Sequence, residues 1–214
     1  MLITPASGDL RNVLQTVVGF PSDYTGTSSI VINDYDFDIV ARNIILLLIA
    51  MHYESNIACP MMLHLWYSAL VPADLVARLE SNLLPLIQDV CSKISNKPEN
   101  SLQAKTWKYK THSMRVVLQK SQWTKLLSYF KVPAGLSASK AHDIRIACTL
   151  APSRVDNLHR FLYTIPTGKR LVVTKFREDG ILLPFGASRK DFTIPNPCVL
   201  YITHPTRKTW LTSC

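Results

Sequence analysis

The sequence predicts an α/β protein with a mostly parallel sheet and helices on both faces. Short apolar runs typical of strands alternate, within residues 1–48, with longer runs that have helical spacing. A turn containing Gly8 follows the first apolar run, and Asn33 and Asp34 follow the second. A strand–helix–strand–helix order of this kind builds parallel, doubly wound sheets.

The first half of the chain supplies the predicted parallel unit. We expect a strand at residues 1–4, a helix at 10–18, a second strand at 28–32 and a helix that starts at Asp36. Asp34, Asp36 and Asp38 suit the start of that helix, because a helix N-terminus carries a partial positive charge. Further helices are expected at residues 61–70 and 74–94, with an interruption at Pro85.

The second half is expected to begin with a hairpin and to continue with helices and short strands. The hairpin is predicted near residues 106–118, in an insertion or at a sheet edge, because aromatic and basic residues alternate there. Helices are expected at 121–130, 141–150 and 155–163, and strands at 171–176 and 199–203. We predict one domain over residues 1–214, with a sub-boundary near the polar residues 96–101.

The composition is that of a globular chain with an uneven charge. Of its 214 residues, 47% are apolar, which is enough for a core without disulfides. The formal net charge of +9 divides into −6 for residues 1–90 and +15 for residues 91–214. The second half could therefore attract an acidic protein, nucleic acid or an anionic membrane, or form an exposed basic face.

The cysteines and apolar runs indicate a compartment. The five cysteines are scattered without the Cys-x-x-Cys spacing of a zinc knuckle, so we expect reduced thiols and a cytoplasmic, or else nuclear, protein. The six histidines show no metal-binding spacing either, and no metal site is predicted. The most apolar run, residues 44–51, is far shorter than the roughly 20 residues of a membrane span, so no membrane association is expected.

Several segments carry a family resemblance. Residues 8–14 read Gly-Asp-Leu-Arg-Asn-Val-Leu and resemble the opening motif of the DUF4470 family. Other segments fit it as well, and the resemblance runs from about residue 6 to residue 198: Asn33 and Asp34, residues 41–47, residues 65–70, Trp123 with residues 126–127, residues 180–186 and residues 191–197.

The resemblance carries expectations about fold and role. The family includes the N-terminal region of dynein axonemal assembly factor 3, a cytoplasmic assembly protein, and fungal proteins that often add a MYND-type zinc finger. The resemblance implies a methyltransferase-like Rossmann sheet without an established catalytic activity. This chain departs from the fungal members in having no cysteine cluster for a zinc finger.

A candidate cofactor site follows from the predicted strand ends. Gly8, Asp9 and Asp34 would lie where a methyltransferase holds S-adenosylmethionine, with Asp34 at the ribose hydroxyls. The turn has one glycine, however, and a single glycine is weak evidence for such a site. The alternative is that Gly8 shapes the turn while Asp9 and Asp34 cap the helices that follow.

Other polar residues have structural and functional interpretations. Arg42 could reach Asp9 or Asp38 and lock the two loops together, or it could form an ion pair without a ligand. His64 lies on an apolar helix without a nucleophile or carboxylate at a useful spacing, and it reads as a core or surface histidine. Residues 105–131 combine aromatic and basic side chains, which could stack bases, or could place the aromatics inward and the lysines outward.

The leading functional hypothesis is a non-catalytic interaction or assembly module on the methyltransferase-like Rossmann scaffold. No residue is predicted to be catalytic. The alternative is an S-adenosylmethionine-dependent methyltransferase of undetermined acceptor, and a weaker one is a nucleic-acid-binding module. The expected partner is a protein, and the charge of the second half would suit an acidic one; sequence-specific nucleic-acid recognition is not expected.

Overall fold

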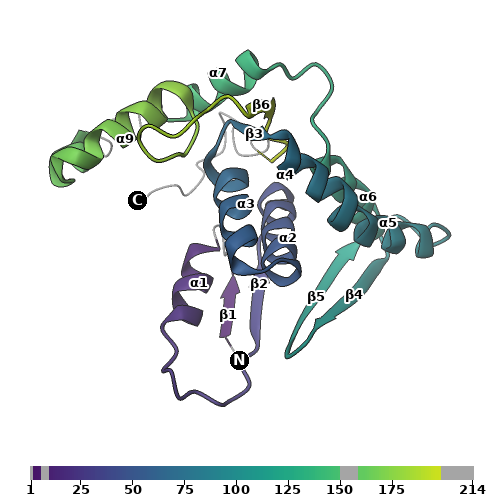
Figure 1. Cartoon of the computed structure of the whole chain (residues 1–214). Coiled ribbons are helices and arrows are strands. Elements are labelled where there is room, and N and C mark those ends of the chain that lie inside the picture. Colours follow the sequence, from purple (N-terminus) through teal and green to yellow (C-terminus); the bar gives the residue numbers. More distant parts are fainter. Residues whose placement is uncertain (1, 6–9, 150–158, 199–214) are drawn as a thin grey trace.

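The computed structural model describes residues 2–5, 10–149 and 159–198 (Figure 1). It begins with β1 (Leu2–Pro5), α1 (Arg11–Val18), β2 (Ile30–Asn33) and α2 (Phe37–His52). β1 and β2 pair in parallel, from Leu2 opposite Ile30 to Pro5 opposite Asn33. The strand–helix–strand–helix order predicted for this segment is therefore present.

The prediction of a Rossmann-like, methyltransferase-like sheet is wrong. In the described residues the parallel pair β1–β2 gains no third strand, and the other two sheets are antiparallel pairs, β3–β6 and β4–β5. A doubly wound sheet needs a strand after each helix. Here α2 is followed by α3 (Ser55–Tyr67) and packs against it, so no third parallel strand follows α2.

The helix α2 is the centre of the core. Its N-cap is Asp36, whose carboxylate accepts a hydrogen bond of 2.9 Å from the Asp38 amide. Ala41, Ile45 and Leu48 of α2 are fully buried, and α2 packs against α3. The core continues without a break on both sides of residues 96–101, from Leu10 to Cys198. The sub-boundary near residues 96–101 stays a prediction.

A long helical segment follows the short strand β3 (Leu70–Pro72). It consists of α4 (Ala73–Arg78), a π-helical turn η1 (Leu79–Leu83) and α5 (Leu84–Lys93). Pro85 has no amide hydrogen to donate to Ser81, four residues earlier. The chain accommodates it with the π turn, in which the Leu84 amide bonds the Leu79 carbonyl, five residues back. The predicted interruption at Pro85 is thus a local change of helix type, and the segment stays helical.

The predicted hairpin forms and is longer than expected. β4 (Leu102–Tyr109) and β5 (His112–Gln119) pair antiparallel, with Trp107 opposite Met114. In Figure 1 the hairpin extends away from α5 and from α6 (Lys120–Leu126), which a 3₁₀ turn η2 (Leu127–Phe130) follows. The hairpin is a sheet of its own, so of the two predicted places, an insertion or a sheet edge, the sheet edge is wrong.

The remaining described elements are α7 (Ala138–Thr149), a helical stretch at residues 159–164, α9 (Thr167–Asp179) and β6 (Phe192–Pro195). The predicted strand at residues 171–176 is wrong, because these residues form part of the helix α9. Val172, Val173 and Phe176 are half-buried at helical spacing, and this pattern outweighs the β-propensity of valine. The strand predicted at residues 199–203 lies outside the described residues.

Within the described chain, no helix is both long enough and apolar enough to cross a bilayer.

Candidate functional site

A buried polar junction joins the end of α3 to two distant segments of the chain. We call it the Asn196 junction and define it as residues 64–70, 180–182 and 192–198. Its centre is Asn196, which is fully buried. The Asn196 side-chain amide donates to the carbonyl oxygens of His64, Leu65 and Ser68, at 3.1, 3.0 and 2.8 Å. These carbonyls lie at the C-terminal end of α3, where the last carbonyls of a helix have no intrahelical partner; the His64 carbonyl also accepts the Ser68 amide at 2.9 Å.

Backbone hydrogen bonds complete the junction. The Asn196 amide donates to the Ala69 carbonyl at 2.9 Å, and the Ala69 amide donates to the Gly180 carbonyl at 2.8 Å. The Asn196 side-chain oxygen accepts the Cys198 amide at 2.9 Å, which forms a tight turn after β6. Three of the segments that carry the family resemblance, residues 65–70, 180–186 and 191–197, therefore meet here. The polar residues of these segments that make the contacts therefore have a structural role, which is to hold the three segments together.

Gly180 fits this place for two reasons. Its φ is +67°, the left-handed conformation that ends α9 and that side chains other than glycine rarely adopt. A Cβ atom at this position would lie only 3.1 Å from the Ala69 Cβ atom. Glycine thus lets the chain turn sharply and approach β3 closely.

His64 has a serine partner that the sequence analysis missed. Its Nδ1 atom lies 3.2 Å from the Ser68 hydroxyl, one helical turn further along α3, and its ring meets Phe192 edge-on at 4.8 Å. Burial lowers the pKa of His64 below 6.5, which favours the neutral ring. The Ser68 hydroxyl is fully buried and already accepts the Leu182 amide at 3.1 Å. The pair is therefore positioned to hold the junction together, and the serine is not accessible to a substrate.

Cys198 is a residue of the junction that belongs to the buried hydrophobic core. It is 1% exposed, and burial raises the pKa of its thiol to about 12, although the positive charge of Arg42 acts in the opposite direction. A thiol in this state is neutral and unreactive at physiological pH. Arg42 and Asn43 of α2 are themselves buried.

Of the three predicted cofactor residues, the structure describes Asp34 alone. Gly8 and Asp9 lie outside the described residues. Asp34 follows β2, and its carboxylate accepts the Asp36 amide at 2.9 Å. Asp34 therefore stabilises the turn before α2 and does not cap the helix as the alternative predicted, since the N-cap of α2 is Asp36.

A second cluster connects the acidic first half to the basic second half. Lys125 of α6 lies 3.1 Å from the Asp38 carboxylate of α2, and the Tyr129 hydroxyl donates to the same carboxylate. The Lys125 ammonium also lies over the rings of Phe37 and Tyr129, at 5.1 and 5.8 Å from their centroids. The cluster fixes α6 and η2 against the start of α2.

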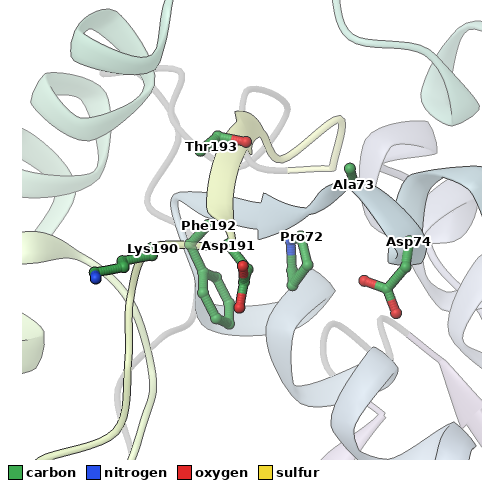
Figure 2. A pocket seen from close by; sticks show the side chains of 7 residues that line it. All are labelled: Pro72, Ala73, Asp74, Lys190, Asp191, Phe192 and Thr193. Atoms are coloured by element: carbon green, nitrogen blue, oxygen red, sulfur yellow. The ribbon is translucent and has the colours of Figure 1, made fainter.

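The surface has an open hollow of about 620 Å³ beside β3 and β6. Figure 2 shows Asp74 and Asp191 on either side of Pro72, with Phe192 and Lys190 in the same lining. Asp34, the predicted cofactor residue that the structure describes, does not line it. In the part of the chain that the structure describes, no three His, Cys, Asp or Glu side chains gather as a metal site would require.

The hairpin has two different faces. Trp107, Val116 and Leu118 are buried on its inner face. The outer face is exposed and has two zones, which are an apolar base formed by Leu102, Ala104 and Val117 and a basic tip formed by Lys108, Lys110 and Arg115. The basic-tip residues have no ion-pair partner among the described residues.

The comparison with family models finds a match for the first third of the chain. Residues 1–71 match the model described as Domain of unknown function (DUF4470). This segment is similar to DUF4470. The prediction from the motifs at residues 8–14, 41–47 and 65–70 is thereby confirmed.

The DUF4470 segment runs from β1 into β3, and it ends beside the Asn196 junction. The resemblances proposed for residues 123–127, 180–186 and 191–197 lie outside the matched range, and the relation to fungal members and to the dynein assembly factor stays a prediction. No curated protein and no solved structure matches the chain.

Proposed function

We propose that this chain is a non-catalytic interaction or assembly module that binds a protein partner. The observation that carries the proposal is the β4–β5 hairpin, which presents an exposed outer face with positive charges that the described residues do not neutralise. Large exposed faces of this kind are typical of interaction sites. The buried polar side chains of Ser68 and Asn196, by contrast, hold segments of the chain together.

The methyltransferase alternative has lost its structural premise. It depended on the strand ends of an extended parallel sheet, at Gly8, Asp9 and Asp34. In the described residues, parallel pairing is limited to the two strands β1 and β2. S-adenosylmethionine binding is nevertheless open to direct measurement by calorimetric titration. Micromolar binding that disappears in Asp34→Ala would contradict the proposal.

The nucleic-acid alternative is weakened by the place of the aromatic side chains. Trp107, Trp123 and Tyr129 are buried, so they are not available to stack on bases. The net charge of the second half favours an acidic protein partner, bound with marked salt dependence because exposed charges are screened beyond roughly 8 Å at physiological ionic strength. The free cysteines Cys59, Cys91 and Cys198 support a reducing compartment, and we place the protein in the cytoplasm or nucleus.

Photo-crosslinking tests the proposal. A photoreactive amino acid is placed singly at exposed positions on different elements, and the full chain is irradiated in cells of its source. The proposal expects a discrete protein adduct from at least one position. A scan without any adduct, under conditions in which the variants are folded, would contradict it.

A further inference from the structure

We propose that the outer edge of β5, at residues 113–117, binds an extended acidic segment of the partner protein by strand addition. This inference rests on the proposed function and names the surface and the chemistry of the partner. It depends on three features of the hairpin. These are an open backbone edge, a charge pattern on the outer face, and a basic tip that would repel the same tip of a second copy.

The backbone edge of β5 is open. In a two-stranded sheet each strand leaves one row of amide and carbonyl groups outside the ladder, and such a row can pair with another strand. β4 is tied to the helices behind it, since the Trp123 indole donates to the Gln103 carbonyl at 3.1 Å and Lys105 pairs with Asp89 at 3.4 Å. No comparable bond reaches residues 113–117 of β5 in the described structure, and this range is fully described.

The outer face of the hairpin selects the chemistry of the added strand. Arg115 lies opposite Thr106, and Lys108 lies opposite Ser113, so the two basic residues are diagonal neighbours on one face. Val117, which is 50% exposed, lies opposite Ala104 nearer the base of the hairpin. A strand beside β5 would therefore place acidic side chains at the tip and an apolar side chain at the base.

The positive charge at the tip is not used within the described chain. Lys105, Lys120 and Lys125 of the same basic segment pair with Asp89, Glu99 and Asp38. The three residues of the basic tip have no such partner among the described residues, and the sequence contains no acidic residue between positions 100 and 142. Neighbouring like charges on one strand face destabilise the hairpin, and carboxylates from a partner relieve this repulsion.

Charge and backbone together favour a peptide over the other occupants. A second copy of the hairpin would bring another basic tip beside the first, and this pairing is repulsive. A nucleic acid would use the charge but not the row of amide and carbonyl groups, and the nearby tryptophans are buried. An extended acidic peptide uses both features, as strand-addition ligands do.

Binding is measured by fluorescence anisotropy with a defined probe. The probe is a labelled peptide in which one valine and two glutamates alternate with threonines, so that the valine and the glutamates share one face. One control peptide has the same sequence with alternate backbone nitrogens methylated, which removes hydrogen bonds and keeps the charge. A second control replaces the glutamates by lysines, and a third probe is single-stranded DNA of mixed sequence.

The full chain and two variants are compared with these probes. Arg115→Glu reverses a charge at the proposed site, and Lys140→Glu makes the same change on the exposed surface of α7. We expect Arg115→Glu to lower the affinity for the glutamate peptide about tenfold. Lys140→Glu should change this affinity less than about twofold. Circular dichroism confirms that both variants are folded, and Lys108→Glu replaces Arg115→Glu if that variant is not.

The outcomes separate the candidates. Loss of binding with the methylated peptide supports strand addition, whereas equal binding of the methylated peptide overturns it. Binding of DNA but not of the peptide, sensitive to Arg115→Glu, would assign the basic tip to nucleic acid and overturn the inference.

A crosslinking comparison separates failure of this inference from failure of the proposed function. Photoreactive residues are placed at Val117 on β5, at Lys140 on α7 and at Leu171 on α9, all of which are exposed. We expect a protein adduct from position 117. Adducts from position 140 or 171 alone would overturn the hairpin site and leave the interaction module standing, and adducts from no position would overturn both.

Discussion

The Asn196 side-chain amide donates a hydrogen bond of 2.8 Å to the Ser68 carbonyl, although 128 residues separate the two in the chain. The same amide reaches two further carbonyls at the end of α3. One side chain therefore satisfies the end of a helix that belongs to the DUF4470 segment from a position outside it.

Replacing Asn196 by alanine should destabilise the protein strongly. The substitution removes the side-chain donor from the Leu65 and Ser68 carbonyls and opens a cavity, and we expect the free energy of unfolding to fall by about 3 kcal/mol or more. Asn82→Ala is the matched control, because Asn82 is exposed and bonds only the Tyr53 hydroxyl in the described contacts. Urea denaturation measures both variants, and equal losses would contradict the central role of Asn196.

Gly180→Ala should destabilise the protein through both conformation and contact. A left-handed φ costs a residue with a Cβ atom about 1–2 kcal/mol, and the approach to Ala69 adds to this cost. Gly168→Ala is the control, because Gly168 lies in α9 and, among the described residues beyond its own helical turn, no atom lies within 4 Å of the added methyl group; there alanine should stabilise by about 0.5–1 kcal/mol. Thermal unfolding should move in opposite directions for the two variants. A stabilising Gly180→Ala would refute the account of the turn.

In the cluster around the Asp38 carboxylate, Tyr129 should contribute more to the free energy of unfolding than Lys125. Tyr129 is fully buried and donates to the Asp38 carboxylate, so Tyr129→Phe should lower the free energy of unfolding by about 1–3 kcal/mol. The Lys125 side chain is 51% exposed, and Lys125→Ala should cost less than about 1 kcal/mol, mostly at low salt. Denaturant titrations at low and high salt test this order, and a larger effect for Lys125→Ala would reverse the assignment.

Stability should fall as the pH falls through the range in which His64 titrates. Burial lowers the pKa of His64 in the folded protein below its usual value of 6.5. The unfolded chain then binds the proton first, so the free energy of unfolding decreases from pH 6.5 downward until the folded-state pKa is passed. His64→Gln should flatten this part of the stability profile, whereas His159→Gln, at an exposed position, should not. An unchanged profile in His64→Gln would exclude the residue as the cause.

The described free cysteines should react with a thiol reagent in order of exposure. Cys59 is exposed, Cys91 is half-buried with a raised pKa, and Cys198 is buried with a pKa of about 12. Alkylation followed by peptide mass spectrometry resolves each cysteine separately. We expect Cys59 to be modified first and Cys198 only when the chain unfolds. Native-state modification of Cys198 at the rate of Cys59 would show that the junction opens readily.

Local features were predictable from the sequence because neighbouring residues determine them. The acidic start of α2, the alternating pattern of the hairpin and the helical spacing after Ser121 each follow from residues close together in the chain. The motifs at residues 8–14, 41–47 and 65–70 likewise identified the DUF4470 segment without reference to contacts.

The architecture and the candidate sites required the tertiary structure. A β–α–β–α order is compatible with a long parallel sheet and with a single parallel pair, and only the packing of α2 against α3 decides between them. Likewise, nothing near Asn196 in the sequence indicates that its acceptors are the carbonyls at the end of α3. The sequence by itself determined the local elements, the charge division and the family of the first third. The tertiary structure decided which polar residues are buried together and which strand edge stays open, because both depend on contacts between segments far apart in the chain.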